Sequence, residues 1–488
     1  MLEKNLGKKT LLMKKILFIE FWNLTPHLET ALEIAKRHCD DGDRVHFVFC
    51  GHDTLFEEGI ILSAKSASYL TKLPEVKGIE LILSSSLKFT PRVKFNAVVH
   101  DIPYVFNDLH DLMNYHYKDF EAGLAVASSL VSQVRNSNPD LNNYSNQIHL
   151  MLESAIQVFD FTKEIIEHEK PDVVYTFNGR LCNSRAVFSA AKASKVEVRL
   201  HETGSSKDRY TAYPFLPHDQ HNVQRSMKDL WSVLDNDLCN KVAHEFFTNR
   251  RSGNILYGTV FTDKQKLGCT PKFKKEKRVI TYFSSSDDEF VAVGDVYKWV
   301  GWKSQLEAVK DLIAICLNIG NIDLYIRLHP HLAKKSFDDQ KRWLTLKEIP
   351  NVTLISFDSE VDTYAMIDNS DIVVSAGSTV GIEAVYWGKV SISLGPSFYS
   401  ELGATYNPVS RAELTQYLLA EDLTADRSKA LPYGYYMSTF GTTFKYYNAI
   451  ERFKGEFMGH NLQKRSIPWR IKDKLRRVMF KFKSNLIG

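Results

Sequence analysis

The segment at residues 371–395, DIVVSAGSTVGIEAVYWGKVSISLG, constrains the fold more than any other part of the chain. Its two short runs of apolar residues predict two buried strands, and the stretch between them predicts a tight turn followed by a short helix. A strand, a helix and a second strand in this order form a βαβ unit, in which the strands are parallel and the crossover is almost always right-handed. The chain is therefore expected to contain a parallel α/β sheet.

The same alternation of strands and helices occurs in both halves of the chain. In the first half we predict strands at residues 16–21, 44–50, 80–84, 95–101, 171–180 and 196–206, helices at 27–40 and 186–193, and a mostly helical region at 109–169. In the second half we predict further strands at 279–283, 324–328 and 351–356, and helices near 305–317, 338–346 and 361–367. This pattern predicts the α/β class, with two doubly wound, Rossmann-like domains that face each other across a cleft.

The length of the chain supports this division, because 488 residues are too many for one compact core. The Lys-rich, apolar-poor stretch at 263–278 is expected to link the domains. We assign residues 1–262 to the N-terminal domain, 279–430 to the C-terminal domain, and 431–488 to C-terminal helices and a basic tail.

Composition excludes several classes of protein. The net charge of +4 is too small to indicate nucleic acid as the main partner. The six cysteines are scattered without a CxxC pair, which argues against a zinc ribbon or a disulfide framework and fits a reducing, cytoplasmic compartment. No apolar run approaches the roughly 20 residues that span a bilayer. The first βαβ loop has no GxGxxG, which disfavours a nicotinamide or flavin site.

The tail at residues 464–483 is rich in Lys and Arg, with apolar residues interleaved at roughly helical spacing. Such a segment can lie on an anionic membrane surface, as in a peripheral protein at the inner face of the plasma membrane. A basic helix end packed on the protein explains the pattern equally well.

The SAGST turn within residues 371–395 is the first candidate site. Ser375, Ser378 and Thr379 supply hydroxyl groups, and Gly377 lets the backbone approach a ligand closely. Backbone N–H groups at the positive end of the following helix suit a phosphate. Thr379 is also a natural N-cap, but a cap needs only one such residue, so phosphate binding is favoured. Glu383, one turn later, is expected to accept hydrogen bonds from ribose or to be an exposed helical carboxylate.

The strand end RLHPH is the second candidate. Alternation puts Arg327 and His329 on the same side of the strand near its carboxyl end, and Pro330 ends the ladder. Together Arg327 and His329 can neutralise a phosphate or pyrophosphate leaving group. No neighbouring carboxylate or Cys completes a metal site here, so no metal is predicted.

The third candidate is the loop SSSDDEF, which includes Ser285 and Ser286. It is expected to contact the substrate or to hold the domains together. Alternatively, Asp287, Asp288 and Glu289 chelate a divalent ion, or the acids cap the start of a helix.

In the N-terminal domain, polar residues follow several predicted strands. A carboxylate at such a strand end fits a general base that deprotonates an acceptor hydroxyl. Glu202, which is followed by Thr203 and Gly204, is our first choice, and Asp101 is the second. Asn178 and Arg180 are expected to bind carboxylate groups of a substrate or to cap the next helix. Two cleft carboxylates also occur in glycosidases, but those enzymes have no need of a phosphate-binding turn.

These motifs resemble those of a known family. RLHP, SAGSTVGIEAVYWGK and the following LG are similar to the donor-binding half of GT-B glycosyltransferases of the capsule-polysaccharide type. FNGR, HETGSS and SSSDDEF resemble motifs of bacterial surface-polysaccharide transferases, so the similarity spans roughly residues 14–396. In related enzymes that use CMP-activated acidic sugars, a His-Pro pair and a Ser-rich loop bind the phosphate. Glu202 would match an acidic residue beside a glycine, although HETG departs from the acidic-acidic-glycine form of Kdo transferases.

The resemblance implies an enzyme that transfers a sugar from a nucleotide-sugar to a growing surface polysaccharide or glycolipid, with the acceptor bound to the N-terminal domain. It implies no cofactor and no metal, because such enzymes stabilise the leaving phosphate with helix dipoles and basic side chains. Domain closure would exclude water from the donor.

Other functions remain open. A CDP-glycerol-type polyol phosphotransferase has a similar frame but should carry a His-Gly-Thr-Pro motif, and only His201 followed by Glu202 and Thr203 is found. A nucleotide-sugar epimerase shares the fold. A non-catalytic scaffold in polysaccharide assembly would bind no nucleotide at all.

Overall fold

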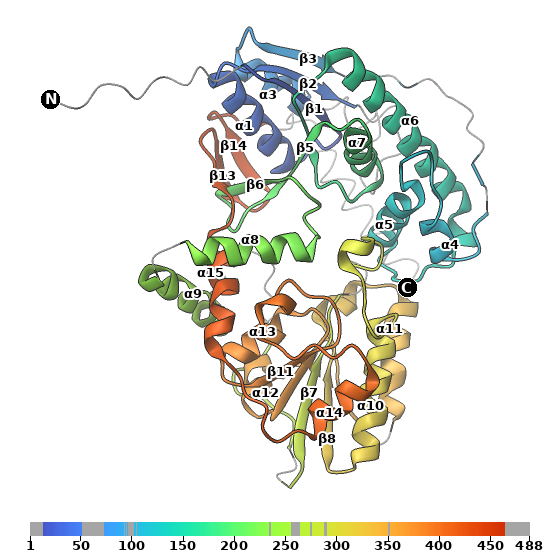
Figure 1. The fold of residues 1–488 in the computed structure, drawn as a ribbon, viewed down its shortest axis with the longest axis vertical. Coiled ribbons are helices and arrows are strands. Elements are labelled where there is room, and N and C mark those ends of the chain that lie inside the picture. The colour runs from blue at the N-terminus through green and yellow to red at the C-terminus, as the bar shows by residue number, and fades with distance from the viewer. Residues whose placement is uncertain are drawn as a thin grey trace, which may run out of the picture.

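The structure, a computed structural model, describes residues 13–50, 73–91, 93, 95, 102, 103, 105–233, 236–254, 264–273, 276–286, 290–349 and 352–463. It contains two α/β domains arranged along the long axis of the molecule, with the N-terminal domain uppermost in Figure 1. Each domain has its own parallel or mostly parallel sheet with helices on both faces, so the predicted fold class is confirmed.

The N-terminal sheet has seven strands among the described residues, in the order β12-β6-β5-β4-β1-β2-β3. The pairs from β5 to β3 are parallel, whereas β6 and β12 extend the sheet in antiparallel fashion. The strands are β1 (Lys15–Glu20), β2 (Arg44–Phe49), β3 (Leu87–Pro91), β4 (Val173–Phe177), β5 (Glu197–Thr203), β6 (Arg209–Tyr213) and β12 (Thr442–Thr443).

The strand β1 illustrates why these sequences are almost continuously apolar. Leu17 and Ile19 pack into the core on one face of the sheet, and Ile16 and Phe18 pack into the core on the other. Because successive side chains alternate and both faces are covered by helices, the central positions of the strand are all apolar.

The C-terminal sheet has five parallel strands in the order β11-β10-β7-β8-β9. Its register sets Phe283 of β7 beside both Ser375 of β10 and Arg327 of β8, so these three strands end side by side. The loops that carry SSS, SAGST and RLHP therefore meet at one edge. The strands are β7 (Arg278–Phe283), β8 (Ile322–Arg327), β9 (Val352–Ile355), β10 (Ile372–Ser375) and β11 (Val390–Ser393).

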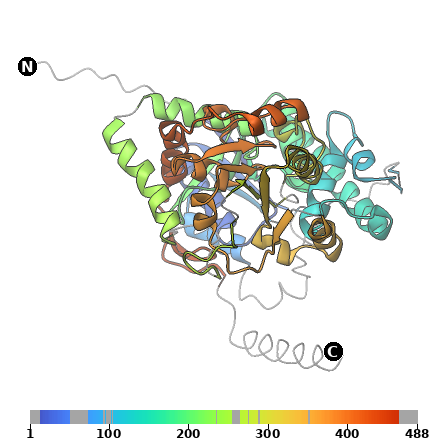
Figure 2. The same cartoon turned by 90° about the horizontal axis from the view of Figure 1, so that it is seen from below.

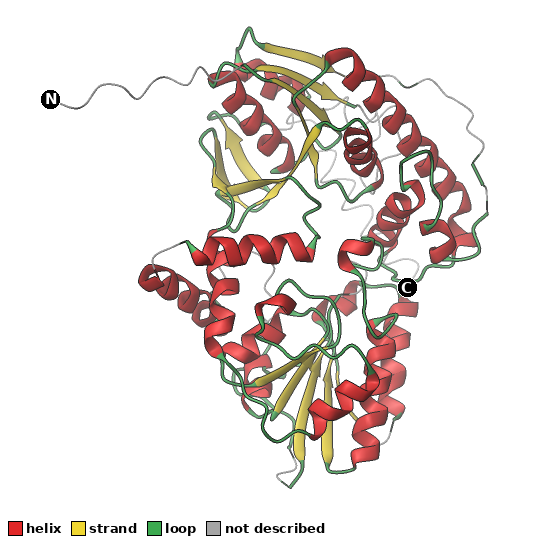
Figure 3. Ribbon diagram, in the orientation of Figure 1, coloured by secondary structure: helices red, strands yellow, loops and turns green. Residues whose placement is uncertain are grey.

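Helices cover both faces of each sheet, as Figures 2 and 3 show from two directions. Those of the N-terminal domain are α1 (His27–Asp40), α3 (Pro74–Ile82), α4 (Leu109–Met113), α5 (Ala122–Val134), α6 (Ser145–Glu169), α7 (Cys182–Ala193) and the 3-10 helix η1 (Leu141–Tyr144). The C-terminal domain has α10 (Gln305–Ile319), α11 (Phe337–Leu344), α12 (Thr363–Asp368), α13 (Thr379–Tyr386), α14 (Arg411–Leu419) and the 3-10 helices η3 (Asp295–Tyr297), η4 (Pro330–Lys334), η5 (Thr345–Glu348), η6 (Ser400–Leu402) and η7 (Arg427–Ala430).

One predicted strand, residues 80–84, is wrong. Residues 80–82 belong to α3, whose buried positions Pro74, Glu75, Gly78 and Ile82 have helical spacing. Proline at the start of a helix is favourable, and the following strand is β3 instead. Most of the strand predicted at 95–101 lies outside the described residues.

A layer of helices joins the two domains. After β6 the chain enters α8 (Gln220–Ser232) and α9 (Asn236–Arg251), which pack with α15 (Leu431–Thr439) against the C-terminal domain. Phe247 of α9 stacks on Tyr386 of α13 with ring centroids 4.1 Å apart. The N-terminal domain was predicted to extend to residue 262, whereas α8 and α9 pack on its neighbour. In Figure 1, α8 lies between the domains.

The chain then returns to the N-terminal domain. β12 pairs with β6, and the hairpin of β13 (Tyr447–Glu451) and β14 (Lys454–Phe457) packs beside α1. The segment after 431, expected to be helical, is thus strand beyond α15. Residues 464–483 lie outside the described residues. Within the described ranges, no helix is both long and apolar enough to cross a bilayer.

A buried carboxylate fixes this returning segment. Glu33 of α1 accepts hydrogen bonds from the backbone N–H groups of Lys445 at 2.9 Å, Tyr446 at 2.7 Å and Tyr447 at 3.1 Å. Arg37 donates to the same carboxylate at 2.6 Å. Glu33 thus satisfies three successive backbone donors, two in the loop before β13 and one at its first residue.

We predict that Glu33→Ala lowers the free energy of unfolding by roughly 3 kcal/mol, because buried N–H groups lose their acceptor. Chemical denaturation monitored by circular dichroism measures the change. The control is Glu451→Ala, which removes an exposed ion pair to Lys454 and should cost less than about 0.5 kcal/mol. Equal losses in the two variants would contradict the anchoring role of Glu33.

Candidate functional site

The strand order of the C-terminal sheet creates a crevice at its centre. From β7 the chain passes through α10 to β8 on one side, and from β10 it passes through α13 to β11 on the other. The loops that leave β7 and β10 therefore diverge, and open α/β sheets bind ligands at such a switch point, beyond the carboxyl ends of the strands. The SSS loop follows β7, and the SAGST turn follows β10.

Hydrogen bonds hold these two loops together. The hydroxyl of Ser285 donates to the carbonyl of Ala376 at 2.6 Å. The side chain of Gln305, fully buried at the start of α10, accepts from the N–H of Ser285 and the hydroxyl of Tyr282, both at 2.8 Å. Gln305 also donates to the Ser285 carbonyl at 3.3 Å. Ser285, near the start of the loop after β7, is thus held by both its backbone and its side chain.

His329 lies at the end of β8, next to these loops. Its N–H donates to the hydroxyl of Ser284 at 2.8 Å, and its Nδ1 accepts from the N–H of His331 at 3.1 Å. Burial, with His331 and Arg327 nearby, lowers the pKa of His329 to about 4. The imidazole is therefore neutral at pH 7 with its proton on Nε2, so it can donate one hydrogen bond to a phosphate but supplies no charge. Pro330 follows as the first residue of η4.

Arg327 and His329 do not act as the pair that the sequence predicted. The buried guanidinium of Arg327 donates to the backbone carbonyls of Ser356 and, at 3.1 Å, Ser359. Burial lowers the pKa of Arg327 to about 10, which leaves it charged at neutral pH. These bonds shape the loop after β9.

The SAGST turn is crowded at its glycine. Gly377 has a φ of +77°, and a Cβ there would lie 2.5 Å from the carbonyl oxygen of Pro396 and 2.9 Å from the hydroxyl of Tyr297. Only glycine fits this position. Ser375 is fully buried, with its hydroxyl 3.3 Å from that of Tyr399.

Ser378, and not Thr379, is the N-cap of α13; its hydroxyl accepts from the N–H of Val380 at 3.4 Å. Thr379 is the first helical residue, and its hydroxyl accepts a bond from Arg250 of α9 at 3.3 Å. Both residues are half-buried, so the turn is only partly covered.

Glu383 is neither exposed nor open to ribose. One oxygen accepts from Nε of Arg250 at 3.0 Å, and the other accepts from the hydroxyl of Tyr364. Glu383 is 3% exposed, and its charge raises the pKa of Arg250 further. Arg250 therefore joins the domain-bridging helix α9 to the first turn of α13.

Glu202, on β5 of the N-terminal domain, is close to another predicted residue. Asn178 donates from Nδ2 to Oε1 of Glu202 at 2.5 Å. Burial is the largest influence on the Glu202 carboxyl and raises its pKa, while the bonds from Asn178 and the N–H of Thr203 oppose the shift. A raised pKa suits a carboxylate that must take up a proton near neutral pH.

Asn178 begins the turn after β4, with a φ of +59°. Its Oδ1 accepts from the N–H of Arg180 at 3.0 Å, and the guanidinium of Arg180 donates to the hydroxyl of Ser132 at 3.0 Å. The structure thus brings Asn178, Arg180 and Glu202 to the same strand ends. Asp101 lies outside the described residues.

A cleft of about 850 Å³ separates the domains. Its C-terminal wall includes Ser285 and Ala376 from the switch-point loops. Its N-terminal wall includes Asp108, the residue before α4, together with Ser137 and Asn138 after α5. A smaller cavity lined by Ser284–Ser286 and His329 adjoins it, since both share Ser285. The cleft's volume of about 850 Å³ is typical of ligand sites.

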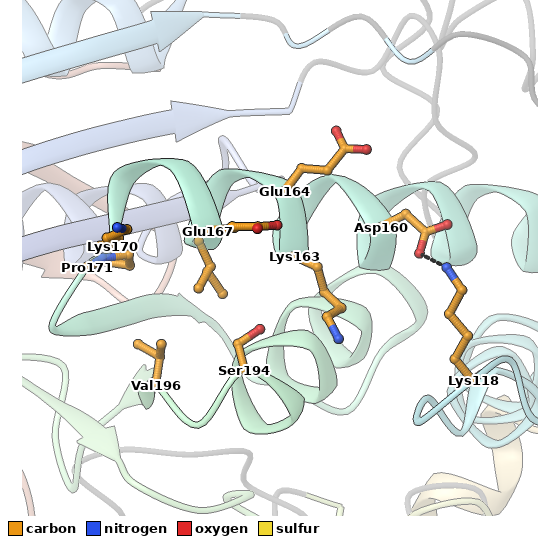
Figure 4. A pocket seen from close by; sticks show the side chains of 10 residues that line it. Lys118, Asp160, Lys163, Glu164, Glu167, Lys170, Pro171, Ser194 and Val196 are labelled. Atoms are coloured by element: carbon orange, nitrogen blue, oxygen red, sulfur yellow. Dashed lines mark hydrogen bonds and ion pairs between the residues drawn. The ribbon is translucent and has the colours of Figure 1, made fainter.

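A second groove, of about 730 Å³, lies elsewhere on the N-terminal domain. Figure 4 shows side chains of α6 around it, including Lys163 and Glu167. It is bordered by Pro171 and Val196, which precede β4 and β5, so it lies at the amino ends of the strands. Ligands of parallel α/β sheets bind at the carboxyl ends of the strands, and this groove lies at the opposite ends and carries charges of both signs. The cleft between the domains is therefore the better candidate site.

No cluster of three or more potential metal ligands occurs among the residues that the structure describes. Asp287, Asp288 and Glu289, the predicted alternative chelating group, lie outside those residues.

Sequence patterns missed residues that shape the cleft. Tyr297, Trp299 and Trp302 line it and come from the excursion between β7 and α10. Arg250, which donates to Thr379 at the start of α13, was missed as well because its helix was assigned to the other domain. The concentration of aromatic residues in VYKWVGW was a signal that could have identified the first three.

Residues 271–429 match the family model of capsule polysaccharide biosynthesis proteins. This range contains the SSS, RLHP and SAGST motifs, so the predicted resemblance to capsule polysaccharide proteins is confirmed over these residues. No curated protein matches the chain.

Several solved structures show a distant likeness. The beta Kdo 2,4 transferase of Thermosulfurimonas dismutans KpsC is 11% identical, with 54% of this chain and 78% of that chain covered and a TM-score of 0.36. The beta Kdo 2,7 transferase of the same protein is 16% identical, with 56% and 78% covered and a TM-score of 0.35. A putative UDP-N-acetylglucosamine 2-epimerase from Listeria monocytogenes is 10% identical, with 89% and 92% covered and a TM-score of 0.28.

We predict that Gly377→Ala disrupts the switch-point turn and reduces nucleotide binding at least 10-fold. Gly388→Ala is the matched control, because Gly388 also has a positive φ, of +80°, but nothing lies within 4 Å of its missing Cβ. Both substitutions share the cost of backbone strain, about 1 kcal/mol. Thermal shifts with added nucleotide measure binding, and an undisturbed response in Gly377→Ala would show that the turn is not part of the site.

Proposed function

We propose that this protein is a glycosyltransferase that moves a sugar from a nucleotide-activated donor to a growing surface polysaccharide or glycolipid. The observation that carries the proposal is the meeting of three polar strand ends, SSS, RLHP and SAGST, at the switch point of the C-terminal sheet. The capsule polysaccharide family match over this region supports it.

The donor phosphate lies at the amino end of α13 in this proposal. Ser378 and Thr379 offer hydroxyls and backbone N–H groups there, and the helix dipole favours negative charge. His329 donates a hydrogen bond from Nε2 to the phosphate, and Ser285 and Ser286 line the approach. No metal is required, because charge on the leaving group is stabilised by groups already in place.

Glu202 acts as the base. Its carboxylate removes a proton from the acceptor hydroxyl as that oxygen attacks the anomeric carbon and the bond to the donor phosphate breaks. Asn178 positions the carboxylate through its hydrogen bond to Oε1. Arg180, at the same strand end, binds acidic groups of the substrate, which suits donors such as CMP-linked acidic sugars.

The polyol phosphotransferase is disfavoured by one observation. The first domain should then carry a His-Gly-Thr-Pro motif, and the histidine of the nearest match, His201, is fully buried and pairs with Glu20 at 2.8 Å.

The proposed location of the enzyme is the cytoplasm, where residues 464–483 contact the anionic inner face of the membrane. Attraction of the basic residues to anionic lipid supports this placement.

Donor binding is tested by thermal shift with CMP, CDP, UDP and GDP, since a ligand that binds only the folded state raises the Tm. We expect at least one nucleotide to do so. His329→Ala should weaken that nucleotide roughly 10-fold or more, because a hydrogen bond to a charged group is lost. His331→Ala is the control, since its retained N–H still orients position 329. No response to any nucleotide would favour a non-catalytic scaffold.

Catalysis is tested by nucleotide release from a panel of nucleotide-sugars with acceptor present. Glu202→Gln keeps a side-chain oxygen that can accept the hydrogen bond from Asn178. This variant should leave nucleotide binding intact while lowering kcat at least 100-fold. Because the pKa of Glu202 is raised by burial, wild-type activity should rise with pH through a value above that of an ordinary glutamate. Glu197→Gln, exposed on the same strand, is the control. Retained turnover would move the base to Asp101 or elsewhere.

A further inference from the structure

We propose that the cleft of about 850 Å³ binds the acceptor as an oligosaccharide, on an aromatic floor that the C-terminal domain builds from residues 290–306. This inference rests on the proposed function, because it adds the second substrate to the donor site. It also differs from the sequence prediction, which assigned the acceptor to the N-terminal domain.

The cleft is continuous with the switch point. Ser285 lines both the cleft and the small cavity beside His329, and Ala376 and Pro396 bring the ends of β10 and β11 into the cleft wall. A molecule bound in the cleft therefore reaches the strand ends where the donor phosphate is placed.

The floor of the cleft is aromatic and rigid. Phe290 stacks on Tyr297 with ring centroids 4.3 Å apart, and the Tyr297 hydroxyl donates to the Pro396 carbonyl at 2.8 Å. Trp302 is buried, and its indole N–H donates to Asp311 at 3.0 Å. Their polar atoms are thus satisfied within the protein, which leaves flat apolar surface for a ligand.

Trp299 is the part of this floor that we expect to contact a ligand, because its indole packs against the C-terminal core while part of it stays exposed. It is half-buried and packs over Gly395, where an added Cβ would lie 2.6 Å from its ring. Gly377 makes room for Tyr297 in the same way. The two glycines of SAGST and SLG therefore admit the aromatic excursion to the strand ends.

An oligosaccharide matches this combination of surfaces. A pyranose ring presents an apolar face of C–H groups, which packs on a flat indole, and a rim of hydroxyl groups. The opposite wall supplies polar partners for the rim from Asp108, Ser137 and Asn138. A few placed polar groups over an aromatic surface are the usual composition of a specific small-molecule site.

Domain contacts fix the width of the cleft on this side. Asp339 of α11 accepts from the N–H of Ser137 at 3.0 Å and from its hydroxyl at 2.8 Å. Arg342 donates to Asn136 at 2.8 Å. These contacts hold the polar wall and the C-terminal domain together beside the cleft.

The decisive variant is Trp299→Ala, with Trp299→Phe as the conservative replacement and Trp231→Ala as a control. Trp231 is also half-buried but lies on α8, away from the residues that line the cleft. The acceptor probe is the mixture of oligosaccharides released by mild acid from the surface polysaccharide of the producing strain. Transfer kinetics, nucleotide thermal shifts and quenching of tryptophan fluorescence by the oligosaccharides are measured for each variant.

We expect Trp299→Ala to raise the KM for acceptor at least 10-fold while the KM for donor and the nucleotide-induced thermal shift stay at wild-type values. Trp299→Phe should restore most of the acceptor affinity, and Trp231→Ala should leave it unchanged. An unchanged acceptor KM in Trp299→Ala would overturn the inference. So would loss of the nucleotide shift, which would mean that the cleft holds the nucleoside of the donor.

Failure of the proposed function has a different signature. If the wild-type protein releases no nucleotide but binds oligosaccharides in a manner that Trp299→Ala abolishes, the cleft assignment survives and the activity is wrong. If it binds neither nucleotide nor oligosaccharide, the proposed activity and the cleft assignment are both wrong.

Discussion

The level carboxyl ends of β7, β8 and β10 are the constraint on which the rest of the site depends. Parallel pairing in register brings Phe283, Arg327 and Ser375 side by side, so three segments spread over nearly a hundred residues of sequence end at one edge. The reversal of strand order between β7 and β10 then forces their loops apart. Ser285, Gln305 and Gly377 act within that crevice: the first two fix one loop, and the glycine lets the other be covered by Tyr297.

The second organising feature is the double passage of the chain between domains. It leaves the N-terminal domain at α8 and returns through α15, and these helices pack with α9 against α13. Arg250 connects this layer to the first turn of α13 through Thr379 and Glu383. A change in the angle between the domains would therefore be felt at the helix end assigned to the phosphate, which relates closure to donor binding in physical terms.

The sequence was informative where a single local pattern decides the outcome. Apolar runs located β1, β7, β8 and β10, and the turn residues of SAGST and RLHP marked the ends that meet at the switch point. The sequence was uninformative where the role of a side chain depends on residues far away along the chain. Nothing local shows that Glu383 is paired with Arg250, that Arg327 turns towards Ser356 and Ser359, or that burial keeps His329 neutral. Residues 80–84 were misassigned because a short apolar run fits a strand as well as the end of a helix.

The return of the chain to its first domain has a consequence for biosynthesis. Tyr447, Ala449, Phe457 and Leu462 complete the apolar core that Phe18 and Leu28 begin on one face of the N-terminal sheet. A ribosome delivers these residues only after the whole C-terminal domain has been made. When these last residues are made, the C-terminal domain already has all of its strands, whereas one face of the N-terminal sheet is still incomplete. The N-terminal domain is therefore translated first but completes its core last.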